Sequence, residues 1–203
     1  MIPAPVNFTG SEKDVKISIL LISIVTLAAC AASAQVNIPI LNPQFNWDVL
    51  TGNPGASQVG ITGWITGPTT GTFKASTTQF PSLPTTGLYC AYVGSAQGYS
   101  SGSIFQTLGA TVQANTVYVL KVIVGARADA PFGGYIATLM AGNVALIAGN
   151  KATPVGGTFV TEEVVYSSGP TPAQLGQPLQ ILIKSTGIGQ VDIPSVSLTA
   201  IAQ

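Results

Sequence analysis

The sequence predicts an all-β protein: a single antiparallel β-sandwich that follows an N-terminal signal segment. Short runs of β-branched and aromatic residues recur along the chain, separated by clusters of Gly, Pro, Asn and Thr. No stretch has a convincing helical period, and 203 residues suit one domain with a leader. The expected strands are 36–41, 60–66, 72–75, 87–93, 103–107, 117–125, 134–140, 144–148, 157–166, 180–184 and 190–200.

The clearest strand pattern lies in residues 116–125. Tyr118 and every second residue up to Val124 are apolar and share one face, and the opposite face is also mostly apolar. Such a strand is central and covered on both sides, or one of its faces lines a groove. The Ala-Gly-Asn sequence at 141–143 predicts a hairpin turn between two strands.

A secretory leader is expected over residues 1–34. The run 17–34 is apolar, follows a positive charge and ends in small residues at 32–34. Cleavage there leaves Gln35 as the first residue of the mature domain, 35–203. We therefore expect a secreted, extracellular or periplasmic protein.

Two alternatives for the leader stay open. Leu27-Ala28-Ala29-Cys30 resembles a bacterial lipobox, in which Cys30 is lipidated and anchors the protein to a membrane. An uncleaved anchor is the other, although the apolar run is short for a spanning helix. Because residues 1–14 fit no part of a signal peptide, we also expect the true translation start to lie at Val15.

Charge and residue inventory exclude several classes of function. Seven basic and seven acidic residues give zero net charge, which provides no footprint for nucleic acid. The chain has no His, which excludes Ser-His-Asp catalysis and imidazole-based zinc sites. Cys90 is expected to be a small buried hydrophobe. Glu162 and Glu163 are adjacent on a strand and should point to opposite faces, so they are not an acid–base pair.

Candidate ligand-binding residues lie in loop-like segments. Trp47, Tyr99 and Phe132 are flanked by loop-forming residues and are expected to be exposed for stacking on a sugar ring. Arg127 and Asp129 are two residues apart in a loop, where they form a surface ion pair or make polar contacts to a sugar. Core positions are expected for Trp64, Tyr118 and Tyr166.

An ordered set of motifs resembles a known family of secreted bacterial β-sandwich modules. This family occurs in PEP-CTERM-type surface proteins and is similar to galactose-binding-like and carbohydrate-binding jelly rolls. The indole-terpenoid cyclases of cyanobacteria resemble the same broad fold, so the resemblance implies a jelly roll without settling function. The matching segments are 40–45, 61–64, 104–108, 115–120, 124–127, 135–142, 157–159, 175–181 and 190–198.

The resemblance also implies a structural calcium ion (Ca2+) where the first and last strands meet. Two acids of the family help to bind it, but Asn46 and Pro194 stand at those positions here. Asp48 and Asp192 lie two residues away on either side. If the two strands pair antiparallel, these carboxylates could rebuild the site one step along.

The leading hypothesis for function is a non-catalytic exported module that binds or adheres to extracellular carbohydrate or matrix, and not an enzyme. One alternative is a structural subunit that self-associates edge to edge in a surface layer or filament. A second alternative is an enzyme that resembles the cyclases, with one buried acid, Glu163 or Asp192, as proton donor. No nucleic acid partner is expected. Association with a membrane is expected only if Cys30 is lipidated.

Overall fold

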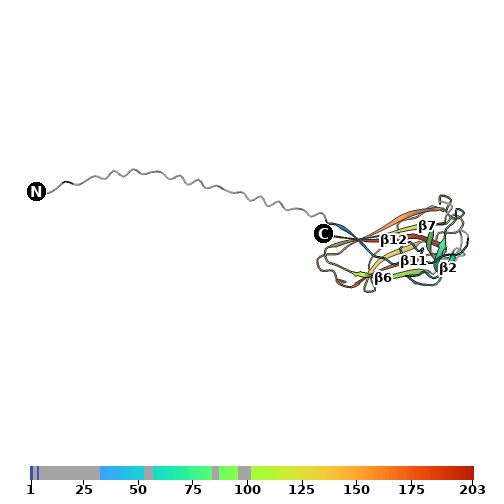
Figure 1. Cartoon of the computed structure of the whole chain (residues 1–203), viewed down its shortest axis with the longest axis horizontal. Coiled ribbons are helices and arrows are strands. Elements are labelled where there is room, and N and C mark those ends of the chain that lie inside the picture. Colours follow the sequence, from blue (N-terminus) through green and yellow to red (C-terminus); the bar gives the residue numbers. More distant parts are fainter. Residues whose placement is uncertain (2–3, 5–32, 53–56, 84–86, 96–101) are drawn as a thin grey trace. The chain divides into compact units, whose positions relative to one another are not determined.

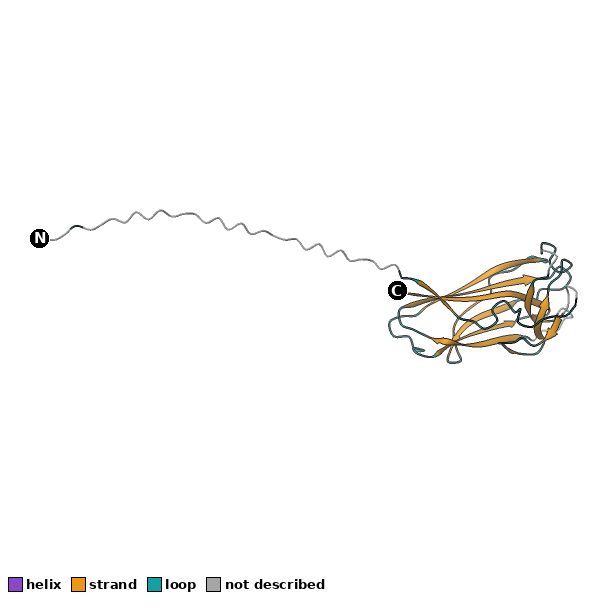
Figure 2. Cartoon of the chain, in the orientation of Figure 1, coloured by secondary structure: helices purple, strands orange, loops and turns teal. Residues whose placement is uncertain are grey.

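In the computed structural model, two antiparallel β-sheets pack face to face (Figures 1 and 2). The structure describes residues 1, 4, 33–52, 57–83, 87–95 and 102–203. Within these residues there are twelve strands and no helix, and all the strands belong to the compact unit Ser33–Gln203. The prediction of an all-β antiparallel sandwich is confirmed.

The described strands divide into a seven-stranded and a five-stranded sheet. The seven-stranded sheet has the order β10 (Thr158–Ser167), β7 (Thr116–Ala126), β12 (Gln190–Ala202), β5 (Tyr89–Gly94), β4 (Thr70–Lys74) and β2 (Ser57–Val59), and β1 (Gln35–Ile38) also pairs with β12. The five-stranded sheet has the order β3 (Ile65–Thr66), β6 (Ser103–Thr111), β11 (Pro178–Ser185), β8 (Tyr135–Ala141) and β9 (Val144–Gly149).

The main core fills the space between the sheets. Leu120 and Ile193 from one sheet and Leu139 and Ile181 from the other are all fully buried in it. Strand β7 lies between β10 and β12, so the prediction of a central strand is confirmed. Trp64 and Tyr118 are buried as expected, and Tyr166 is partly buried with its ring 6.2 Å from that of Tyr118.

One long edge of β12 is shared by two shorter strands. Strand β1 pairs with its C-terminal part as far as Ile38 opposite Leu198, and β5 pairs with its N-terminal part as far as Ala91 opposite Ile193. Between these pairings, residues 194–197 have no strand partner on this edge in the described part of the chain. The segment after β1 fills the gap, because the Val196 N–H donates to the Pro43 carbonyl at 3.0 Å.

Local turn chemistry explains where expected and observed strands differ. The expected strand 60–66 is wrong: β2 and β3 lie in different sheets. Between them the Trp64 N–H donates to the Ile61 carbonyl at 3.1 Å, and Gly63 has a φ of 89°, so the chain turns there. The expected hairpin at 141–143 is confirmed, with positive φ at Gly142 and Asn143 between β8 and β9.

The leader prediction falls almost wholly outside the described residues. Residues 5–32, which include Val15 and Cys30, are not described. No helix capable of crossing a membrane is found in the described ranges. Signal cleavage, lipidation and export therefore stay predictions.

The main core provides a test of the packing. Leu120→Ala should lower the free energy of unfolding by about 2–5 kcal/mol, because it removes a fully buried side chain and leaves a cavity. Val165→Ala on the neighbouring strand, where Val165 is 45% exposed, should cost well under 1 kcal/mol. Urea unfolding measures both, and equal losses would contradict this packing.

Candidate active site

A second, smaller apolar cluster covers the other face of the seven-stranded sheet. Side chains alternate along β5, so Ala91 and Val93 enter the main core while Cys90 and Tyr92 face outward. We call the outward group the outer cluster. Its members are the buried residues Phe73, Ala75, Phe80 and Cys90 and the partly buried residues Leu83, Tyr92 and Phe159.

The segment after β4 covers this cluster. The Phe80 ring is fully buried and stacks on the Phe159 ring, with centroids 4.1 Å apart and planes at 16°. Backbone bonds hold the segment, since the Ala128 N–H donates to the Gln79 carbonyl at 2.9 Å. Cys90 is fully buried as expected, and burial raises the pKa of its thiol.

Asp192 lies on the same outer face of the sheet. Val191 and Ile193 point into the main core, so Asp192 points outward, between Gly125 of β7 and Tyr92 of β5. Its side chain is fully buried. Gln190 Nε2 donates to Asp192 Oδ1 at 2.6 Å, whereas Asp192 Oδ2 has no hydrogen-bond partner among the residues that the structure describes.

Burial of this carboxyl changes its acidity. Desolvation is the largest effect and raises the pKa of Asp192 from its usual 3.8 to about 7, against the hydrogen bond from Gln190 and the charge of Arg127, which lower it. A carboxyl with such a pKa exists in both protonation states near neutral pH. It can therefore give up a proton and take one back.

Arg127 and Asp129 form a bidentate ion pair beside this acid. Both contacts measure 2.8 Å, and Asp129 keeps its charge because the pair lowers its pKa. The pair was expected at the surface, but the Arg127 side chain is only 15% exposed and its guanidinium lies 5.1 Å from the Phe73 ring centroid. Its positive charge therefore lies against the outer cluster and lowers the pKa of Asp192.

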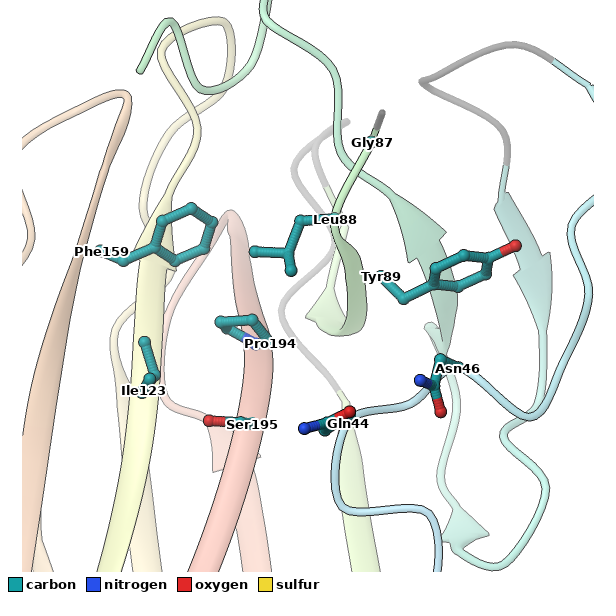
Figure 3. Close-up of a pocket in the computed structure, with 9 residues that line it drawn as sticks. All are labelled: Gln44, Asn46, Gly87, Leu88, Tyr89, Ile123, Phe159, Pro194 and Ser195. Carbon is teal, nitrogen blue, oxygen red and sulfur yellow. The ribbon is translucent and has the colours of Figure 1, made fainter. Parts of the chain in front are cut away.

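A pocket of about 460 Å³ opens at the gap between β1 and β5. Figure 3 shows Phe159 and Leu88 pointing toward each other with Pro194 between them, while the Tyr89 ring points away. None of the described residues that line it is charged. They are Gln44, Asn46, Gly87, Leu88, Tyr89, Ile123, Phe159, Pro194 and Ser195.

Gly125 creates a flat floor where the pocket meets the outer cluster. A Cβ at this position would lie 2.4 Å from Cε1 of Phe159 and 3.1 Å from Cε1 of Phe80. The stacked rings can therefore rest on the sheet only because this residue has no side chain. Phe159 belongs both to the pocket and to the outer cluster, so it connects the two.

The structure distributes the expected ligand-binding residues over several places. Trp47 is 53% exposed on the segment after β1. Phe132 is only partly buried and packs edge-on against Tyr135, and its backbone bridges to Gln190, which Arg127 also contacts. Tyr99 lies outside the described residues.

The donor set does not fit calcium. Asp48 accepts hydrogen bonds from the Thr62 N–H at 2.8 Å and from the Thr62 and Thr72 hydroxyls, and it lies beyond the end of the pairing between β1 and β12. Asp48 and Asp192 are therefore not brought together on paired strands. In the described part of the chain, no three acidic or Cys side chains gather as metal ligands.

Of the two acids named for a cyclase, only Asp192 is buried. Glu163 is about half exposed and pairs with Lys121 at 3.1 Å, whereas Glu162 is buried and accepts from the Tyr135 hydroxyl at 2.6 Å. The two adjacent acids thus point to opposite faces, as expected.

Sequence reasoning missed Gln190, Phe80, Phe159 and Gly125. For Gly125 a signal existed, since a Gly inside a strand of β-branched residues indicates close approach of another group.

A β-sandwich in which a buried acid with a raised pKa lies on the same sheet face as a cluster of aromatic rings suits acid catalysis on an apolar substrate. Residues 36–199 match the model of the HpiC1-like family, described as HpiC1 cyclase, and the chain belongs to this family. No curated protein sequence matches it.

Solved cyclase structures are similar over nearly their whole length. The apo form of a cyclase from Fischerella sp. is 28% identical with a TM-score of 0.72, over 83% of this chain and 98% of that one. The Stig cyclase Fisc from Fischerella sp. TAU, in complex with (3Z)-3-(1-methyl-2-pyrrolidinylidene)-3H-indole, is 29% identical with a TM-score of 0.73, over 84% of this chain and 100% of that one. A cyclase from Fischerella sp. TAU in complex with 4-(1H-indol-3-yl)butan-2-one is 30% identical with a TM-score of 0.70, over 83% and 99%.

These findings correct the leading hypothesis. The expectations of a non-catalytic adhesion module, of a protein that is not an enzyme, and of a glycan or matrix partner are wrong, because the family and the similar structures are cyclases. The motifs used for that expectation belong to a sandwich that binding modules and cyclases share, so they predict the fold and not the site. The alternative of a cyclase with one buried acid is the one these findings support.

The raised pKa of Asp192 predicts an unusual pH dependence of stability. Its pKa is higher in the folded state than in the unfolded state, so folding favours the protonated form and stability falls as pH rises from about 4 to about 7. The fall is at most about 4 kcal/mol. Urea unfolding between pH 5 and pH 8 should show this slope in the wild type.

Asp192→Asn removes the titrating group and should flatten the slope. Glu163→Gln, which changes an exposed acid, serves as the control and should keep it. An Asp192→Asn protein with the wild-type slope would show that another group is responsible.

Proposed function

We propose that this protein is an acid-initiated cyclase in which Asp192 donates a proton to a largely apolar substrate bound on the outer face of the seven-stranded sheet. The observation that carries the proposal is the Oδ2 atom of Asp192, which is fully buried and has no hydrogen-bond partner in the described part of the chain. Membership of the HpiC1 cyclase family supports the class of reaction.

The reaction follows from the chemistry of one carboxyl. The protonated Oδ2 transfers its proton to an unsaturated carbon or a heteroatom of the substrate, which becomes a cation. A second unsaturated group of the same molecule gives its π electrons to the cationic centre, and a carbon–carbon bond closes the ring. The product cation then returns a proton to the Asp192 carboxylate, so the net change is an isomerisation that consumes no reagent.

The outer cluster suits a cationic intermediate. Aromatic faces attract cations, and a buried apolar site excludes the water that would otherwise trap one. Arg127 above Phe73 already places a cation on a ring face of this cluster.

The pocket and the ring stack support a substrate with a flat aromatic part. The described residues of the lining are uncharged, which favours a neutral ligand. Phe80 stacked on Phe159 shows that a flat ring packs against the sheet at Gly125, the β7 residue that pairs with Asp192. Two similar cyclases hold indole compounds in their structures. We propose an indole ring that carries an unsaturated hydrocarbon chain as the substrate class.

Turnover tests the acid directly. Asp192→Asn should lower kcat by at least about 100-fold, because it removes the proton donor and keeps the shape of the side chain. The assay follows cyclised products from a panel of indoles with unsaturated side chains by mass spectrometry coupled to chromatography. Glu163→Gln should keep wild-type turnover, and an active Asp192→Asn protein would contradict the proposal.

We also propose that the protein is exported, because an apolar run with small residues at its end precedes residue 35. Signal cleavage should leave Gln35 at the N-terminus of the mature protein, which N-terminal sequencing of the secreted fraction measures. A lipidated mature N-terminus at Cys30 would contradict it.

A further inference from the structure

Gln190 connects the buried acid to the ion pair beside it. Its side chain is 95% buried. Its Nε2 donates to Asp192 Oδ1 at 2.6 Å, and its Oε1 accepts from Arg127 Nη1 at 3.5 Å. Arg127 is in turn held by two 2.8 Å contacts with Asp129. Four side chains thus form one chain of contacts that ends at Asp192.

Arg127 decides which way the Gln190 amide faces. A guanidinium has donors and no acceptor, so only the amide oxygen can meet it. If the amide were reversed, its NH2 group would face the guanidinium and its oxygen would face Asp192 Oδ1 at 2.6 Å, which is unfavourable at both ends when Asp192 is ionised. The arginine therefore directs a donor toward Oδ1.

A donor on Oδ1 makes the two oxygens of Asp192 different. Oδ1 accepts a hydrogen bond and carries the negative charge best, whereas Oδ2 is buried and has no partner among the described residues. The proton therefore sits on Oδ2 in the acid form. When Oδ2 loses that proton, Oδ1 is already solvated by Gln190.

We propose that Arg127 and Gln190 are positioning residues that place the transferable proton on Oδ2 of Asp192 and stabilise the carboxylate left behind, with Asp129 opposing their effect. The inference rests on Asp192 being the proton donor of the proposed cyclase. Neither residue needs to touch the substrate.

The charges that face Asp192 act with opposite signs. Arg127 lowers the pKa of Asp192 and Asp129 raises it, while burial raises it most. The titratable neighbours on the packed strands are Cys90, whose pKa is raised, and Tyr92, whose pKa is also raised, so both are neutral near pH 7. With these neighbours neutral, the positive charge of Arg127 lowers the pKa of Asp192 and so opposes the effect of desolvation.

The test is an NMR titration of the Asp192 carboxyl in the full-length protein labelled with ¹³C at aspartate side chains, with Asp192→Asn to assign the signal. Arg127→Gln and Gln190→Leu should each raise the pKa of Asp192 by about one pH unit, since each removes a group that stabilises the carboxylate. Asp129→Asn should lower it, because a negative charge is lost. Arg127→Lys keeps the positive charge, so the pKa of Asp192 should rise less in this variant than in Arg127→Gln.

A merely structural role would not produce shifts of opposite sign for the two members of one ion pair. Lys121→Met and Glu163→Gln, which disrupt the exposed pair between β7 and β10, should leave the titration of Asp192 unchanged. Circular dichroism checks that each variant is folded, and Asp129→Asn keeps the test available if the arginine variants do not fold.

An unchanged pKa in both Arg127→Gln and Gln190→Leu, or a raised pKa in Asp129→Asn, would overturn the inference. The pH profile of kcat/KM should shift in the same directions as the titration. The titration needs no turnover, so the two proposals can fail separately. If Asp192→Asn keeps wild-type turnover but the Arg127 and Asp129 variants still shift the pKa of Asp192 in opposite directions, the proposed acid is rejected and the electrostatic coupling stands.

Discussion

The packing of Phe80 onto the outer face of the seven-stranded sheet is the interaction on which the rest of the site depends. Strand β12 already has one face in the main core. The segment that carries Phe80 packs on the outer face of this sheet over Gly125 and Phe159, and on the same face Asp192, which alternation alone would leave in water, is fully buried. Without burial the carboxyl would be solvated and have an ordinary pKa.

The position of the pocket follows from an interrupted strand edge. Strands β1 and β5 share one edge of β12 and leave residues 194–197 between them. Pro194 has no N–H to offer a neighbouring strand, and the register with β7 shifts between Asp192 and Ser195. No described strand pairs with β12 along this stretch, so a loop fills the gap imperfectly and leaves a pocket lined by Pro194 and Ser195. The same two family positions that would hold calcium acids, Asn46 and Pro194, line this neutral pocket.

The fold could be predicted from the sequence because strand alternation is a local property. The apolar period of β7 and the turn residues between β8 and β9 both predicted what the structure has. The expected strand 60–66 failed because an apolar run does not reveal the positive φ of Gly63. The outward direction of Asp192 was also predictable, since it lies between two core residues.

The environment of Asp192 could not be predicted in the same way. The outer cluster on its face of the sheet is built largely from residues far earlier in the chain, and hydrogen bonds link Arg127 to it through Gln190. The Arg127–Asp129 pair itself was visible as two opposite charges in one loop, but its place above Phe73 depends on the packing of β4 against the sheet. Long-range packing of this kind decides whether an acid on a strand is a solvated surface group or a buried group that can donate a proton.

The partial pairing of Asp192 is what suits it to a cycle of proton loss and gain. A buried carboxylate with every oxygen paired to donors and cations stays ionised, and one with no partner at all stays protonated. Here desolvation favours the acid form, one amide donor and a nearby arginine favour the anion, and an aspartate weakens the arginine. Because these effects oppose one another, neither form is locked, and the site can return to its starting state after each turnover without an external acid or base.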